Sequence, residues 1–126
     1  MQRLSVIMTE SLFYLPEAEM NVEFKFKEGC LRILLKGEID HHTAKDICKT
    51  SDLHIMNEKP HTVLLDFSFV TFMDSSGLAV VVGRKRLCQK IGARIYIVNI
   101  SGHPEKILRM AGADRLIEFA EDSDEE

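Results

Sequence analysis

The sequence lacks a long hydrophobic run: the longest spans the five residues 78–82. A membrane-spanning helix needs about twenty mainly apolar residues, so we expect no membrane segment. Cysteine is scarce too, and Cys30, Cys48 and Cys88 are widely spaced and odd in number. This spacing fits neither a disulfide framework nor a zinc site, and it favours the reducing environment of the cytoplasm.

The sequence also lacks an excess of basic residues. Lysine and arginine total 16 against 20 aspartate and glutamate, for a net charge of -4. Residues 121–126 alone carry -5, so the rest of the chain is close to neutral. A nearly neutral body is not drawn to a phosphate backbone, so we expect no nucleic-acid partner. Mutual repulsion of the last charges predicts that residues 120–126 form an acidic, disordered tail.

Nucleotide-binding and catalytic signatures are missing from the sequence. It contains no GxxxxGK[ST] loop, no GxGxxG and no GxSxG, and no HExxH or HxxxH pair. These are the spacings that cradle phosphates, expose a nucleophilic serine or hold a metal. We therefore expect no cofactor and no bound metal, and the sequence contains few signs of enzymatic activity.

The length and composition fit a single globular domain. A chain of 126 residues with 45% hydrophobic residues can bury one ordinary core. Residues 1–20 include a short apolar stretch but no signal-peptide cleavage pattern. This N-terminal extension is either a short helix or a loose arm, or else Met20 is the natural start and the extension is not native. We expect the domain to occupy residues 21–119.

A hairpin is predicted at the start of that domain. Residues 23–27 alternate polar and apolar side chains, Glu28-Gly29 forms a tight turn, and residues 31–37 form a second strand. A helix over residues 43–57 follows, and Thr50-Ser51 predicts a bend or break in its middle.

Strands and helices alternate in the remaining sequence. We expect strands at 62–67 and 94–99 and helices at 75–91 and 105–111, and residues 116–119 form either a short final strand or an apolar tether. The order ββαβαβα predicts an α/β fold, with a mixed, largely parallel sheet of four to five strands packed by three to four helices. Right-handed crossovers place the strand-to-helix loops on one sheet edge, where binding sites of open α/β sheets lie.

The first candidate site is residues 69–78, between a buried strand and a helix. Asp74, Ser75 and Ser76 are all helix-capping types, so the helix begins there. Unpaired N–H groups at a helix start could meet a phosphate on Ser75, which would add roughly -1.5 to -2 of charge beside Asp74. On composition alone the simpler interpretation is structural, an N-cap followed by Gly77 for close packing of helix and sheet.

The second candidate site is residues 37–43, between the second strand and the first helix. The adjacent His41 and His42 point in different directions, so they rarely bind one metal together. The structural interpretation is that Asp40 and Thr43 cap the helix. Further on, Arg84, Lys85, Arg86 and Lys90 predict a solvated basic face, or a docking patch for an acidic partner.

Several motifs together resemble a known family. They are GEIDHHTA (37–44), FMDSSGL (72–78), LRMAG (108–112), IEF (117–119) and Asp66. This combination is similar to the anti-sigma factor antagonists of the STAS superfamily. The resemblance spans residues 21–119, and the first two segments favour the sporulation branch of that family.

The resemblance implies a STAS-type fold and a non-enzymatic partner switch. In this family the unmodified protein binds an anti-sigma factor that is also an ATP-dependent serine kinase, and the sporulation sigma factor is released. The kinase then phosphorylates the first serine of the DSSG motif, here Ser75, and the partners separate. A PP2C-type phosphatase restores the unmodified form.

By the same resemblance, the binding surface surrounds Ser75. Its expected members are Asp40, His41, His42, Asp74, Ser76 and Gly77. We expect the protein to act as a monomer. Three alternatives stay open: a stress-response antagonist of the same family, a small hydrolase with Ser75 as nucleophile, and an adaptor that is never modified.

Overall fold

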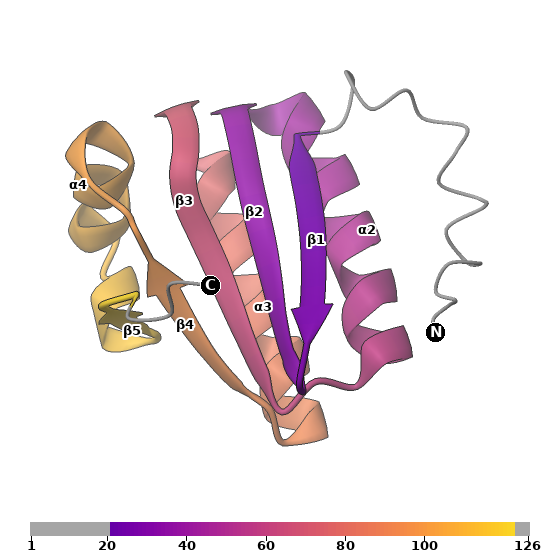
Figure 1. The fold of residues 1–126 in the computed structure, drawn as a ribbon. Coiled ribbons are helices and arrows are strands. Elements are labelled where there is room, and N and C mark those ends of the chain that lie inside the picture. Colours follow the sequence, from indigo (N-terminus) through magenta and orange to yellow (C-terminus); the bar gives the residue numbers. More distant parts are fainter. Residues whose placement is uncertain (1–20, 123–126) are drawn as a thin grey trace.

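The computed structural model describes residues 21–122, which form one five-stranded sheet in the order β1-β2-β3-β4-β5 (Figure 1). The strands are β1 (Val22–Lys27), β2 (Cys30–Ile39), β3 (Thr62–Met73), β4 (Arg94–Val98) and β5 (Glu118–Ala120). β1 pairs antiparallel with β2, and the other neighbours pair in parallel. The predicted hairpin and the predicted mixed, largely parallel sheet are confirmed. The extension at 1–20 lies outside the described residues.

Three α-helices and one 3-10 helix connect the strands within the described residues. They are α2 (His41–Glu58), α3 (Ser76–Ile91), α4 (Gly102–Met110) and η2 (Ala113–Arg115). Because the parallel strands follow one another in chain order, right-handed crossovers place successive helices on the same face. Figure 1 shows α2 and α3 behind the sheet, and none of the helices in residues 21–122 lies in front of it. No helix in residues 21–122 has the length and apolar character to cross a membrane.

Several predicted boundaries change in the structure. α2 runs without interruption through Thr50 and Ser51, so the predicted break is wrong. Both side chains are buried in the fold, and tertiary packing overrides their weak helix propensity. β3 continues six residues beyond the predicted end, from Phe67 to Met73, because it stays paired with β2.

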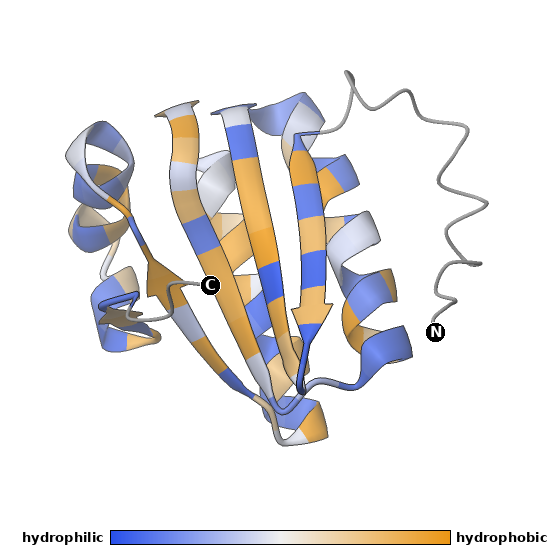
Figure 2. Ribbon diagram, in the orientation of Figure 1, coloured by the Kyte–Doolittle hydropathy of each residue, from blue (hydrophilic) through white to orange (hydrophobic). Residues whose placement is uncertain are grey.

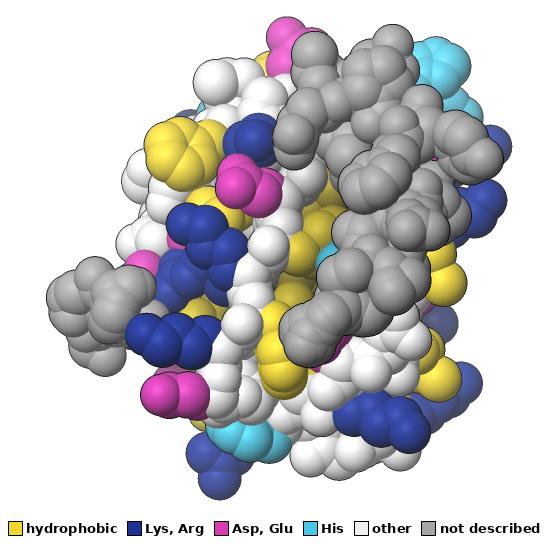
Figure 3. Space-filling view, turned by 45° about the vertical axis from the view of Figure 1, so that its right-hand side comes forward, with side chains coloured by type: hydrophobic (Ala, Val, Ile, Leu, Met, Phe, Trp, Pro, Cys, Tyr) yellow, Lys and Arg dark blue, Asp and Glu magenta, His cyan; other side chains and the backbone are white. Residues whose placement is uncertain are grey.

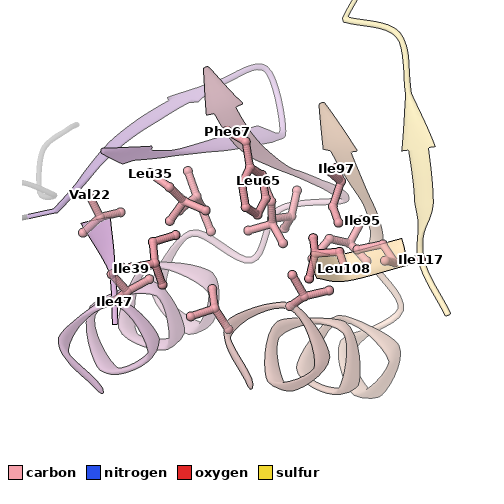
Figure 4. Packing of buried hydrophobic residues seen from close by; sticks show 14 of the residues in the cluster. Val22, Leu35, Ile39, Ile47, Leu65, Phe67, Ile95, Ile97, Leu108 and Ile117 are labelled. Carbon is pink, nitrogen blue, oxygen red and sulfur yellow. The ribbon is translucent and has the colours of Figure 1, made fainter. Parts of the chain in front are cut away.

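The core lies between the sheet and the helices. Leu35, Leu65 and Ile97 come from three adjacent strands and point toward the helical layer (Figure 4). Ile47 of α2 meets them from the other side. Figure 2 shows the same division, with long hydrophobic stretches in the central strands and mixed hydropathy in the helices. Burial of these alternating positions fixes which side chains reach the opposite face.

Polar side chains lie on that opposite face. Asp66 alternates with the core residues of β3 and is 3% exposed. Its carboxylate is held by Arg32 of β2, which also binds Asp122 beyond β5. Ala120 closes β5 and Asp122 contacts the sheet, so these two residues, predicted as part of a disordered tail, are placed in the fold. Residues 123–126 lie outside the described part of the chain.

Candidate functional site

The two candidate loops meet at one edge of the sheet. Ile39 at the end of β2 is the register partner of Met73 at the end of β3. The N–H of Asp74 donates to the carbonyl of Ile39 over 3.2 Å. In Figure 1 the two strands end side by side at the top of the sheet, where α2 and α3 begin. The structure thus brings Asp40 and Asp74 next to each other.

Asp40 caps α2. Its Oδ1 accepts from the N–H groups of His42 and Thr43, each at 3.0 Å, and Thr43 Oγ1 accepts from the Asp40 N–H at 2.9 Å. This capping box satisfies N–H groups that a helix start leaves unpaired. The N–H of Thr43 is the main reason that the pKa of Asp40 lies below its usual value. The prediction that Asp40 and Thr43 cap this helix is confirmed.

The two histidines at the start of α2 lie on the surface beside Asp40. His41 and His42 are both exposed, and their ring centroids lie 5.7 Å apart with planes inclined by 63°. Among residues 21–122, no group of three or more His, Cys, Asp or Glu side chains is placed to hold a metal ion. The rings are therefore positioned as surface groups at the first turn of α2.

Ser75 directly precedes α3, and its side chain does not cap the helix. Its backbone is helical, with φ -65° and ψ -12°, its side chain is exposed, and its hydroxyl makes no capping hydrogen bond. The capping carboxylate belongs to Asp74, whose Oδ1 accepts from the N–H of Ser76 at 2.7 Å. Of the three predicted capping residues, Asp74 takes the role and leaves the Ser75 hydroxyl at the surface.

The first N–H groups of α3 are already paired. Those of Gly77 and Leu78 donate to the carbonyls of Asp74 and Ser75, each at 3.0 Å, and that of Ser76 donates to Asp74 Oδ1. The expectation that these N–H groups are unpaired, and so could meet a phosphate on Ser75, is wrong for this conformation. A phosphate would instead lie beside the Asp74 carboxylate, where two negative groups repel each other.

Gly77 acts beneath the surface. It is buried, and a Cβ at this position would overlap the side chain of Met73. The glycine therefore lets the first turn of α3 lie directly on the end of β3, as predicted from its place in the helix. Gly77 therefore allows the start of α3, next to Ser75, to pack closely on the sheet, and it has no side chain that could contact a partner.

Two features were not found from the sequence. Phe72, three residues before Ser75, is 45% exposed and stacks on His103 of α4. The aromatic residue was visible in the motif, but its partner is thirty-one residues away and only the fold shows it. Conversely, Arg84 does not join the predicted solvated basic face: it is 6% exposed and pairs with Asp52 of α2.

The environment of Ser75 does not resemble that of a catalytic serine. Within residues 21–122, no hydrogen bond joins the Ser75 hydroxyl to a histidine. A serine nucleophile needs a base within hydrogen-bond reach. What the site offers is an exposed hydroxyl beside a carboxylate, on a surface with charged and polar neighbours. Figure 3 shows the mixed character of another side of the molecule, where basic and acidic side chains lie among one another.

The fold and the site together define the family. Residues 21–126 match the STAS domain model, and the chain belongs to the STAS domain family. It is similar to the anti-sigma F factor antagonist of Paenibacillus polymyxa, with 29% identity over 98 residues, 78% of this chain and 84% of the relative. It is also similar to the anti-sigma-B factor antagonist of Bacillus subtilis strain 168, with 26% identity over 105 residues, 83% of this chain and 94% of the relative.

Solved structures agree with this assignment. The anti-sigma factor antagonist SpoIIAA in its unphosphorylated form superimposes with a TM-score of 0.69 at 27% identity, covering 79% of this chain and 87% of that one. The Bacillus cell fate determinant SpoIIAA in the phosphorylated form gives 0.62 at 27% identity, covering 79% and 90%. STAS anti-sigma factor antagonists are non-enzymatic regulatory proteins, in accord with the absence of catalytic motifs in the sequence.

Proposed function

We propose that this protein is an anti-sigma factor antagonist controlled by phosphorylation of Ser75. Its unmodified form would bind an anti-sigma factor that is also a serine kinase, and so release a sigma factor for transcription. The observation that carries the proposal is the Ser75 hydroxyl. It is exposed, makes no capping bond and stands beside Asp74, at the edge where Asp40 begins α2. The relatives named as anti-sigma factor antagonists support the same function.

The proposed binding surface combines both loops. Asp40, His41 and His42 contribute from the start of α2, and Asp74 and Ser76 flank Ser75 at the start of α3. The hydrogen bond from Asp74 N–H to the Ile39 carbonyl keeps these two groups together. Gly77 supports the surface from below through its contact with Met73.

Phosphorylation would act on this surface by charge. The kinase transfers the γ-phosphoryl group of ATP to Ser75 Oγ, ADP leaves, and the hydroxyl proton is released. The product carries roughly -1.5 to -2 of charge at pH 7. The N–H groups of Ser76, Gly77 and Leu78 are occupied, so this charge stays directed at the partner. A partner surface that fits a neutral hydroxyl beside Asp74 then meets a strongly negative group, and a PP2C-type phosphatase resets the switch.

The sporulation branch is the first choice of pathway, in the cytoplasm. It is favoured by the GEIDHHTA and FMDSSGL segments and by similarity to anti-sigma F factor antagonists. The stress-response branch is the second candidate, because the anti-sigma-B factor antagonist of Bacillus subtilis aligns over 94% of its length. Binding assays with anti-sigma F and anti-sigma B factors side by side separate the two.

The decisive experiment mixes the purified protein, the cognate anti-sigma factor kinase and ATP. Intact mass spectrometry followed by peptide mapping should find one phosphate, on Ser75, that needs both kinase and ATP. Ser75→Ala should accept no phosphate yet still bind the kinase. Absence of phosphate, with the kinase shown active on another substrate, would contradict the proposal.

Two matched variants locate the effect. Ser76→Ala should still accept phosphate at Ser75; if phosphate is lost there, the acceptor is Ser76. Asp40→Asn keeps a residue that caps helices well and removes the charge, whereas Asp40→Ala removes both. Weaker kinase binding by Asp40→Asn at unchanged melting temperature assigns the Asp40 charge to the partner surface.

A further inference from the structure

Two exposed phenylalanines stand out on the last part of β3. Phe69 is 58% exposed and Phe72 is 45% exposed. The preceding core residue of the same strand, Phe67, is 4% exposed. Single exposed apolar side chains are common on protein surfaces, so these two rings matter here because both lie on the strand that leads into the candidate site.

Irregular pairing with β2 turns Phe69 outward, whereas Phe72, five residues beyond the inward-facing Phe67, lies on the outward face in the regular alternation as well. Leu34 pairs with Asp66 but Lys36 pairs with Phe69, so β3 contains one extra residue there. A second extra residue follows, since Gly37 pairs with Val70 and Glu38 with Phe72. Such β-bulges interrupt the regular alternation of a strand and re-aim side chains, and they recur beside functional sites. Both bulges lie within eight residues of Ser75 and lead directly into its loop.

The ring of Phe72 is held in place by a second element. His103, the second residue of α4, stacks on it with ring centroids 5.6 Å apart and planes inclined by 14°. His103 is itself exposed. The Phe72–His103 pair is therefore an ordered aromatic surface, made by β3 and α4 at the same sheet edge as Ser75. An anchor that is already fixed loses little conformational entropy when a partner covers it.

We infer that the Phe72–His103 pair is the hydrophobic part of the surface that binds the anti-sigma factor. This inference rests on the proposed function and extends it to a third element of the fold. Phe72 is three residues from Ser75 along a continuous strand and loop, so a protein that covers the Ser75 hydroxyl also covers this ring. The partner must present an apolar pocket there, next to the polar groups that face Ser75 and Asp40. Aromatic anchors of this kind carry much of the energy of protein interfaces.

The inference divides binding into two contributions. The first contribution is electrostatic: it depends on the charge at Ser75 and is screened by salt. Burial of the apolar Phe72 ring depends little on moderate salt. The aromatic contact thus supplies affinity in the unmodified state, and the phosphate on Ser75 opposes it without altering the rings themselves.

The test measures the dissociation constant for the anti-sigma factor kinase by isothermal titration calorimetry at two salt concentrations. Phe72→Ala should weaken binding roughly tenfold or more at both concentrations. Leu53→Ala is the matched control, because Leu53 is 53% exposed on the middle of α2, away from Ser75, and it should bind as the parent does. His103→Ala should weaken binding less than Phe72→Ala, and His103→Phe, which keeps a stacking ring, should retain it.

The outcomes distinguish a failure of this inference from a failure of the proposed function. If the unmodified parent fails to bind any anti-sigma factor, the proposed function fails. If the parent binds and Phe72→Ala, shown folded by circular dichroism, binds equally well, only the aromatic contact is wrong. His103→Ala leaves β3 unchanged, so it decides the matter should Phe72→Ala not fold. An unchanged dissociation constant for His103→Ala would then overturn the inference.

Discussion

Arg32 and Asp122 are ninety residues apart in sequence and form a two-pronged ion pair. Arg32 Nη2 lies 3.0 Å from Asp122 Oδ1, and Nη1 lies 3.1 Å from Oδ2. Nη1 also donates to Asp66 Oδ2 at 2.6 Å, and Asn99 Nδ2 donates to both carboxylates. These four residues, the Arg32 network, join β2, β3, the end of β4 and the C-terminal side of β5 on the sheet face opposite the core.

Acid should weaken the protein through the Arg32 network. Burial alone would raise the pKa of Asp66, but hydrogen bonds from Ser68, Asn99 and Arg32 outweigh it and hold the pKa below the usual 3.8. A lowered pKa gives stability that is present above the usual value and lost as pH falls through the folded value. Asp66→Asn should lower the free energy of unfolding at pH 7 by about 1–3 kcal/mol and flatten its decline below pH 4. Urea titrations at pH 7 and pH 3.5 measure both effects.

An exposed ion pair provides the control for Asp66→Asn. Lys36 and Glu23 lie 3.3 Å apart with 37% and 47% of their side chains exposed. Solvent screening makes such pairs weak, so Glu23→Gln should change stability by less than about 0.5 kcal/mol. Equal losses from Glu23→Gln and Asp66→Asn would show that the Arg32 network has no special role.

The close contact of α3 with β3 makes a second prediction. Gly77→Ala introduces a Cβ that overlaps the buried Met73 side chain, and overpacking of this kind costs about 1–3 kcal/mol. Gly83→Ala is the internal control, because a Cβ there meets nothing within 4 Å. In a helix interior that change should stabilise by about 0.5–1 kcal/mol. Opposite signs of the two melting-temperature shifts support the contact, and equal signs would contradict it.

The ion pair between α2 and α3 includes a buried arginine. We therefore expect substitutions of its two members to lower the free energy of unfolding by unequal amounts. Arg84 Nε lies 2.9 Å from Asp52 Oδ1, with 7% of the arginine side chain and 43% of the aspartate side chain exposed. Asp52→Asn leaves the guanidinium buried without its counter-charge and should cost about 1–3 kcal/mol. Arg84→Met replaces the charge by an apolar chain and should cost less than that, or even stabilise. Chemical denaturation of both variants tests the order, and a larger loss for Arg84→Met would reverse the interpretation.

Local chemistry made much of the fold predictable. Asp40 and Thr43 mark the start of α2, Glu28-Gly29 marks the hairpin turn, and Gly92 ends α3 in a left-handed conformation with φ 78°. Each signal lies within a few residues of the feature that it predicts. The placement of Asp40 and Asp74 at one edge of the sheet was predictable as well, because both follow parallel strands, which end at the same edge.

What escaped prediction depends on contacts distant in sequence. Arg84 resembles its basic neighbours in the sequence, and only the position of Asp52 on another helix makes it a buried residue. The bulge that turns Phe69 outward arises from pairing between β2 and β3. The paired N–H groups of α3 depend on the turn geometry of Asp74. Residue types indicate capping ability, but they do not say which of three adjacent capping residues takes the role.

His54 should make the protein less stable in mild acid. Its ring stacks on Phe24 with centroids 3.8 Å apart, and burial lowers its pKa to about 4 despite Glu58 at 3.9 Å. Unfolded chains protonate this histidine near the usual 6.5, whereas the folded protein does not until about pH 4. Titration of His54 therefore does not lower the free energy of unfolding above pH 6.5, and lowers it progressively as the pH drops from there toward 4. Between pH 7 and pH 5 the loss due to His54 should be about 1–2 kcal/mol. His54→Phe keeps the stacked ring without the titration, so its urea midpoint should decline less over that interval; parallel declines would refute the assignment.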